Sequence, residues 1–289
     1  MITGFKDLDN LMMIRPGEVI VLGGRPAMGK SCLLRQIAMN MCADGLAMVW
    51  LVDLQNNPKE TQMLCMCQEA EIERNLVGPI NSFEEGHPLK LAQLNQEAAC
   101  AGDRPDLSKL DGVSYQRLVA AANAPQIQHL NIIDLESDNE FEELLKMKEW
   151  PDILVIDTIQ MLSICLESWF EIAHMVKRLK RRAIKEDTVV ILGSDISRKV
   201  DERQGHRPMM GDLSDSSALE EVANKVLFLQ RRDYYDPNDK PGLAEVQIVK
   251  DSVGNGGIFA LMFRKEIGKF VDYEPPVLDY SDNDAFTPR

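Results

Sequence analysis

The chain has 289 residues, 45% hydrophobic and 6% aromatic, with a formal net charge of −14 at pH 7, which argues against a protein that coats nucleic acid through bulk charge. This length is enough for one large domain or two small ones with a sizeable core. No apolar run reaches the roughly 18 residues of a membrane helix, and the N-terminus MITGFKDLDN lacks signal-peptide features, so we expect a cytoplasmic protein without a membrane partner.

The N-terminal third predicts a strand–helix–strand unit. Its elements are expected at 18–24 (strand, EVIVLGG), 31–43 (helix) and 46–54 (strand, LAMVWLVDL). Such alternation is typical of a parallel α/β sheet. A helix is expected over 58–75, whereas the polar span 78–128 gives only short helical patches.

Apolar runs after residue 128 predict the rest of the sheet. The expected strands are LNIIDL (130–135), DILVIDTIQML (152–162, running into a loop), TVVILGSD (188–195), KVLFLQRRD, AEVQIVKDS and GIFALMFR, with helices over 139–150 and 170–186. The pattern indicates an α/β fold with a mostly parallel central sheet flanked by helices and a C-terminal antiparallel edge hairpin. We expect one domain over 1–275 and an acidic, disordered tail over 276–289.

A phosphate-binding loop follows the first predicted strand. Gly24-x-x-x-x-Gly29-Lys30-Ser31 matches the P-loop pattern in full, and a chance Gly-rich turn does not explain the strand before it and the helix after it. Glycines let the backbone approach phosphates closely, and N–H groups at the helix start form an anion cradle. We therefore expect ATP and Mg²⁺ as cofactors. The expected nucleotide-binding residues are Gly24, Arg25, Pro26, Ala27, Met28, Gly29, Lys30, Ser31 and Cys32.

A magnesium site needs a second group beside the P-loop hydroxyl of Ser31. Asp157 ends the apolar run ILVID, where a carboxylate is costly unless it faces a ligand. The alternative is an Asp that caps a helix or turn just past a strand. With a P-loop in the same chain, we expect Ser31 and Asp157 to be the metal ligands.

These residues, in this order, resemble the C-terminal, RecA-like ATPase domain of DnaB-type replicative helicases, and the resemblance covers nearly the whole chain. It is carried by TGFKDLDNLM, GRPAMGKS, DILVIDTIQML, FEIAHMVKRLKRRAIKE, GSDISRKVDERQGHRPMMGDLSDSSALEEVANKVLFLQRRDYY, Lys250 and Gly254. The resemblance implies a RecA-like P-loop NTPase fold. It also implies a ring, usually a hexamer, that holds ATP between subunits, threads single-stranded DNA and works with other replication proteins.

The chain departs from the family near the expected phosphates. Where the family has a water-activating Glu, this chain has Gln55, which orients water but accepts no proton, and Asp53 is the nearest carboxylate. Where the family has a Gln, this chain has Asp195, an anion that repels a triphosphate. The expected catalytic residues are Lys30, Asp53, Gln55, Asp157, Asp195 and Lys250, of which Asp53 is expected as a substitute for the missing Glu.

A third departure concerns groups that the family sends across the subunit interface. Lys250 matches the family's Lys, but Ser252 stands where the family has an arginine finger, a group worth orders of magnitude in rate. Candidate replacements from a neighbouring subunit are Arg231, Arg232 and Arg264.

The DNA contacts are expected in the segment after the 188–195 strand. The expected DNA-binding residues are Arg198, Lys199, Arg203, Ser214 and Ser216. Ser214 stands where the family carries an Arg, which weakens the expected phosphate contact but leaves backbone N–H donors for it. The basic run KRLKRRAIK at 177–185 is an alternative surface, although a solvated helix face is the favoured interpretation. Arg25 alternatively pairs with an acid at the domain surface.

Three functions are consistent with these residues. The first is a DnaB-like, ATP-dependent helicase motor. The second is a non-hydrolysing, nucleotide-dependent DNA-binding or assembly module on the same fold, which Gln55, Asp195 and Ser252 favour. The third is a RecA-like regulator without a DNA role, which the negative net charge favours.

Overall fold

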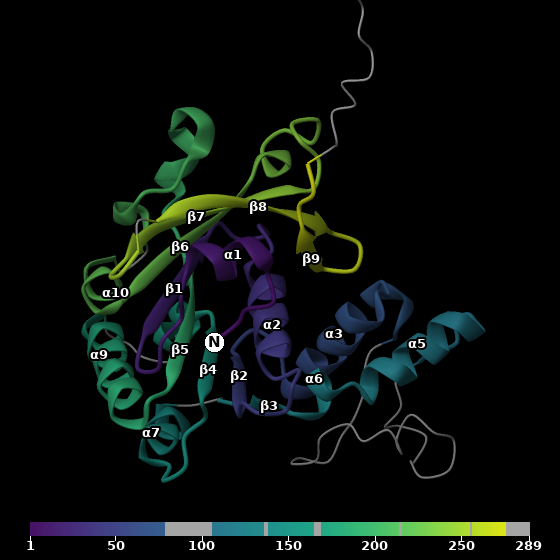
Figure 1. Cartoon of the computed structure of the whole chain (residues 1–289), viewed down its shortest axis with the longest axis horizontal. Coiled ribbons are helices and arrows are strands. Elements are labelled where there is room, and N and C mark those ends of the chain that lie inside the picture. The colour runs from purple at the N-terminus through teal and green to yellow at the C-terminus, as the bar shows by residue number, and fades with distance from the viewer. Residues whose placement is uncertain (79–105, 136–137, 165–168, 214–215, 255, 276–289) are drawn as a thin grey trace, which may run out of the picture.

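A computed structural model describes residues 1–78, 106–135, 138–164, 169–213, 216–254 and 256–275, and the expected tail over 276–289 lies outside them (Figure 1). Within these residues the strands form one nine-stranded sheet in the order β3-β2-β4-β5-β1-β6-β7-β8-β9. The strands are β1 (Val19–Gly24), β2 (Val49–Asp53), β3 (Leu130–Ile133), β4 (Ile153–Asp157), β5 (Val189–Asp195), β6 (Lys225–Arg231), β7 (Leu243–Asp251), β8 (Gly257–Arg264) and β9 (Lys269–Asp272).

The first six strands in this order are parallel, and the last three pair antiparallel, which confirms the predicted fold class. β1, β2, β4 and β6 are buried along their whole length, as expected for strands covered on both faces. β7 instead alternates buried and half-buried positions, because one face of the antiparallel part meets less of the core.

The helices are α1 (Lys6–Leu11), α2 (Lys30–Met41), α3 (Pro58–Ala70), α5 (Gly112–Ala122), α6 (Pro125–Gln128), α7 (Asp138–Lys146), α8 (Ile159–Ile164), α9 (Trp169–Glu186) and α10 (Ser216–Val222). They divide between two hydrophobic clusters, one on each face of the sheet. α1, α2, α3, α5 and α6 pack with Ile20 and Leu22 of β1, while α7, α9 and α10 pack with Val19 and Val21 (Figure 1). Alternate β1 side chains therefore serve opposite cores. None of the helices described is long and apolar enough to cross a membrane.

Two local expectations were wrong. The segment after β4 is helix α8 rather than a loop, and it begins at Ile159, which is fully buried. The C-terminal hairpin of β7 and β8 is extended by a further strand, β9, beyond the predicted hairpin. β9 has four residues, and Phe270 is its one buried side chain, so it carries little periodic signal.

Helix α2 is fastened to segments from both ends of the chain. The side-chain amide of Gln36 donates to the Phe270 carbonyl at 2.7 Å and accepts from the Phe270 N–H at 2.8 Å, which ties α2 to β9. One turn further on, Asn40 Nδ2 donates to the Thr3 carbonyl at 2.9 Å. The helix that begins at the P-loop thus has a fixed position against the sheet.

Candidate active site

The P-loop connects β1 to α2 at the carboxyl ends of the parallel strands. Ala27 and Gly29 adopt left-handed backbone conformations with φ of 63° and 98°. A Cβ at Gly29 would come within 2.9 Å of Phe270 Cζ, so this position requires glycine. Gly29 caps α2 without any side-chain hydrogen bond, which leaves the N–H groups of the first turn directed at the loop. This is the geometry of an anion site at a helix N-terminus.

The buried side chain of Lys30 is held inside this loop. Its Nζ donates to the Gly24 carbonyl at 2.9 Å and to Asp195 Oδ1 at 2.7 Å. Gly24 and Asp195 are register partners on the neighbouring strands β1 and β5. The predicted P-loop lysine and the predicted Asp195 therefore meet at one point.

The residues predicted to hold magnesium also meet. Asp157 is fully buried at the end of β4, and burial raises its pKa against the opposing effect of a hydrogen bond from the Ser31 hydroxyl. Oδ1 accepts from Thr158 Oγ1 at 2.9 Å, whereas Oδ2 has no hydrogen-bond partner among the described residues. A buried carboxylate oxygen without a donor, beside a hydroxyl, fits a divalent cation with oxygen ligands.

Gln55 follows β2 and reaches toward the same carboxylate. Its Nε2 donates to Thr158 Oγ1 at 3.1 Å, and this hydroxyl in turn donates to Asp157. The Gln55 side chain is otherwise exposed. An amide is therefore connected to the carboxylate predicted to hold magnesium through one threonine, at the place where the resemblance implies a water-activating group.

Asp53 is arranged differently from Asp157, although the two are register partners on β2 and β4. Its carboxylate accepts from the Gln55 N–H at 3.0 Å, from Asn56 Nδ2 at 3.0 Å and from Thr61 Oγ1 at 2.9 Å. The buried guanidinium of Arg35 lies 3.9 Å away. These contacts favour a structural role, in which Asp53 orders the turn after β2 and balances Arg35.

Replacing Asp53 with Asn is therefore expected to lower the free energy of unfolding by about 3 kcal/mol, because it leaves Arg35 charged and unpaired in the core. Urea denaturation checks this, with Asp44→Asn as the control because Asp44 is exposed and accepts one backbone hydrogen bond that an amide retains. Unchanged stability together with lost ATP turnover would instead assign Asp53 to catalysis.

Residues 1–272 match the family model described as the DnaB-like helicase C terminal domain. The chain belongs to this family. A replicative DNA helicase DnaB from Geobacillus stearothermophilus is 27% identical over 278 residues, covering 94% of this chain and 56% of the relative. A probable plasmid replicative DNA helicase from Chlamydia psittaci is 26% identical over 277 residues, covering 93% and 54%. The chain thus spans about half the length of these relatives.

Solved structures agree with this assignment. A DnaB-like replicative helicase, studied with its interactions with primase, gives a TM-score of 0.75 at 28% identity and covers 94% of this chain and 62% of that chain. A second solved structure, described as an ATPase domain, gives 0.73 at 28% identity, covering 94% and 91%. A KaiC-like protein from Pyrococcus horikoshii, at 15% identity and a TM-score of 0.59, shares the RecA-like fold alone.

In this DnaB-like domain, Arg25 links the P-loop to the segment after β5. Its guanidinium pairs with Asp201 at 2.9 Å, as the alternative interpretation of Arg25 requires, whereas nucleotide binding by Arg25 stays a prediction. Asp201 lies in the 3-10 helix η2 (Arg198–Glu202) and also accepts from the Tyr235 hydroxyl at 2.8 Å. The Tyr235 ring stacks on His206 with ring centroids 3.8 Å apart. The sequence could indicate an acid partner for Arg25, but not which acid.

The residues predicted to bind DNA are in different situations. Arg198 and Lys199 are exposed on η2. Arg203 is engaged with Asp212, at 2.7 and 3.0 Å, and this hydrogen bonding holds the pKa of Asp212 below its ordinary value. Ser214 lies outside the described residues. Ser216 begins α10, but the structure does not describe its side chain. η2 is therefore the part of the predicted DNA surface with exposed cations.

The predicted interface residues lie away from the P-loop of their own subunit. Lys250 pairs with Val226 near the amino end of β6, and its Nζ donates to the Glu220 carbonyl at 2.7 Å. Ser252, two residues after Lys250, donates its N–H to the Asn224 carbonyl. This placement at the opposite end of the parallel strands is consistent with groups that would act on a neighbouring subunit.

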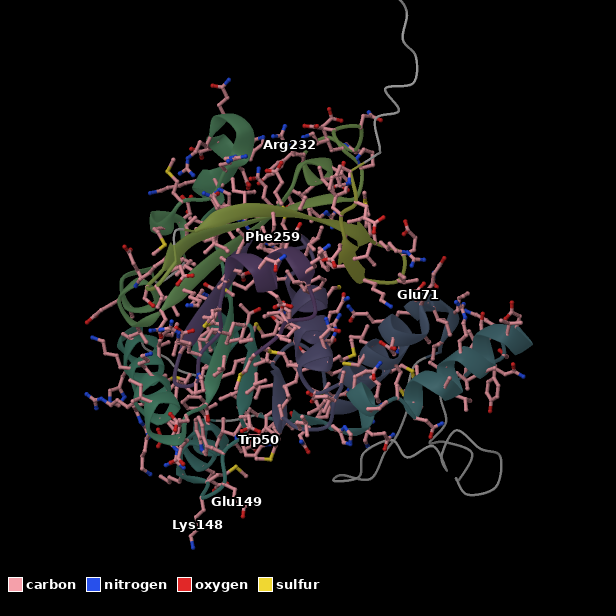
Figure 2. All side chains as sticks on the ribbon, viewed as in Figure 1. Trp50, Glu71, Lys148, Glu149, Arg232 and Phe259 are labelled. Carbon is pink, nitrogen blue, oxygen red and sulfur yellow. The ribbon has the colours of Figure 1, made fainter. Side chains whose placement is uncertain are left out.

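The candidate replacement arginines are largely engaged within the subunit. Arg231 is buried, pairs with Asp233 at 2.9 Å and lies 4.6 Å from the centroid of the Phe263 ring. Arg264 donates to Glu71, which lies between α3 and β9 (Figure 2). Arg232 is on the surface, with carboxylates no closer than 3.8 Å (Figure 2). Of the three, Arg232 is the most available to a neighbour.

Most basic side chains of the run at 177–185 on α9 are paired within the molecule, which favours the interpretation that this run is a solvated helix face and not a DNA-binding surface. Lys177 pairs with Glu221, Arg178 with Glu142, and Arg182 with Glu186. Lys180 donates to the Gly17 carbonyl and the Asn224 side chain. These contacts hold α9 to its surroundings, while Arg181 and Lys185 are exposed to solvent.

Proposed function

We propose that this chain is the motor domain of a DnaB-like DNA helicase, which binds and hydrolyses ATP and couples hydrolysis to translocation on single-stranded DNA in replication. The observation that carries the proposal is the convergence of Lys30, Ser31 and Asp157 at one end of the sheet, in a chain that matches the family model over 1–272. We propose that the domain extends over 1–275, assembles into a hexameric ring and meets other replication proteins.

In this proposal each group of the site has one task. The N–H groups of the first turn of α2 bind phosphate, and Lys30 binds the terminal phosphates once it leaves Asp195. Ser31 and Asp157 would hold Mg²⁺, which when bound neutralises phosphate charge and orients the leaving group. Gln55 orients the attacking water without taking its proton. Lys250 would reach the nucleotide of a neighbouring subunit.

A second candidate function is a nucleotide-dependent DNA-binding or assembly module that does not hydrolyse ATP. It is supported by the same geometry, because an amide stands at the water-activating position and a carboxylate contacts the P-loop lysine. Ser252 adds to it, since no guanidinium stands at the expected finger position.

ATP turnover with and without single-stranded DNA distinguishes the two. We expect DNA to stimulate turnover of the wild-type chain and Lys30→Ala to abolish it, with hexamers detected by analytical ultracentrifugation in the presence of ATP. Tight ATP binding without turnover at any DNA concentration would contradict the motor proposal and support the module. The Lys30→Ala variant controls for contaminating ATPases.

A further inference from the structure

We propose that Asp195 determines the nucleotide preference of this site: it competes with phosphate for Lys30 and disfavours a triphosphate more than a diphosphate. The inference rests on the proposed function to the extent that it takes ATP as the nucleotide. It goes beyond the proposed function by stating what a carboxylate at this position changes relative to a neutral side chain. The change is how strongly the site retains the γ-phosphate.

The first support is the position of the carboxylate. Asp195 Oδ1 lies 2.7 Å from Lys30 Nζ, a charge-assisted hydrogen bond to the amine that in P-loops reaches the β- and γ-phosphates. A carboxylate oxygen at this distance stands where a phosphate oxygen would contact the same amine. Asp195 and a terminal phosphate are therefore rivals for one cation.

The second support is that the backbone of Asp195 is held in place. Its N–H donates to Gln160 Oε1 at 3.0 Å, and the same side chain donates through Nε2 to Ser194 Oγ at 3.0 Å. The residue is also paired with Gly24 of β1. The carboxylate can rotate away from Lys30, since its side chain is 40% exposed, but it cannot leave the vicinity of the phosphate site.

The third support is electrostatic. When phosphate takes Lys30, Asp195 loses its partner and faces an anion at close range. The ion pair with Lys30 is lost for any nucleotide whose phosphate reaches this amine, whereas the repulsion is larger for ATP, because ATP adds the charge of a γ-phosphate that ADP lacks. Because exposed charges are screened by water, we expect a difference of about tenfold in affinity rather than several orders of magnitude.

Equilibrium titration with ADP and with a non-hydrolysable ATP analogue, both with Mg²⁺, tests the inference on the full chain. Asp195→Asn is expected to raise the affinity for the ATP analogue by about tenfold and the affinity for ADP by about threefold or less. The nucleotide preference therefore shifts toward the triphosphate. Asp195→Gln should act in the same direction. Glu149→Gln is the matched control, because Glu149 is exposed just before β4, at the amino ends of the parallel strands, and its replacement removes the same charge from the end of the sheet opposite Lys30 (Figure 2).

Equal tightening of both ligands, or no change, would overturn the inference. So would a loss of turnover in Asp195→Asn with unchanged affinities, because that result would make Asp195 a group acting on the attacking water. Failure of the proposed function is seen separately, as absent turnover or absent DNA stimulation in the wild type, while the ratio of the two affinities remains measurable.

Discussion

Replacing Asp157 with Asn is expected to reduce ATP turnover by at least about 100-fold while making the nucleotide-free protein more stable. Turnover falls because an amide is a poor magnesium ligand at a site where Asp157 and Ser31 are the proposed donors. Stability rises because Asp157 is buried with one oxygen unpartnered, so its charge is unfavourable in the folded state. We expect the Tm to rise by about 3 °C, or roughly 1 kcal/mol for a chain of this size.

The pH dependence supplies an independent check of this stability effect. Burial raises the pKa of Asp157, so the folded state binds its proton more tightly than the unfolded chain does. The wild type therefore loses stability as the pH rises from the ordinary Asp range through the raised pKa, and Asp157→Asn lacks this loss. Thermal unfolding of both proteins across this range measures it, with the exposed Asp7→Asn as control. A less stable Asp157→Asn at neutral pH would contradict the interpretation.

Replacing Gln55 with Glu is expected to raise ATP turnover by about 10- to 100-fold, because a positioned general base contributes about 10²–10⁴ in rate and Gln accepts no proton. The Gln55 side chain already points toward Thr158 and, through its hydroxyl, Asp157.

Single-turnover ATP hydrolysis compares Gln55→Glu with the wild type and with Gln55→Ala. Gln55→Ala removes the amide without adding charge, so it reports how much the amide contributes by orienting water. We expect this variant to lower the hydrolysis rate by about tenfold or less. Equal rates for all three proteins would show that position 55 does not act on the attacking water. The motor proposal would then need another group, and Asp195 would be the next residue to test.

Burial on both faces made most of the sheet predictable. The fully buried strands β1, β2, β4 and β6 are continuous apolar runs, and a parallel sheet requires such runs wherever helices cover both faces. β9 escaped prediction because its place depends on a reciprocal amide contact from Gln36, more than 200 residues earlier in the chain. Such long-range pairing leaves no local period in the sequence.

The candidate site was also predictable only in part from the sequence. The P-loop and Asp157 were predictable because their chemistry is local: glycines, a lysine and a hydroxyl in series, and a carboxylate after an apolar strand. The ion pair of Lys30 with Asp195 was not, because it depends on the register between β1 and β5. The contacts of Asp53 depend likewise on Thr61 and Arg35, which pattern alone does not place.

The anchoring of α2 has a consequence for synthesis of the protein. Asn40 contacts Thr3, near the start of the chain, whereas Gln36 contacts Phe270, near the end of the described residues. A ribosome that has released the P-loop and the parallel strands still holds back β9. Since chains emerge at about 5–20 residues per second, the nascent domain waits on the order of 10 seconds or more between making Lys30 and receiving the strand that secures its helix. Until then α2 packs on β1, β2 and β4 and is bonded to Thr3 through Asn40, but it lacks the reciprocal amide contact between Gln36 and Phe270.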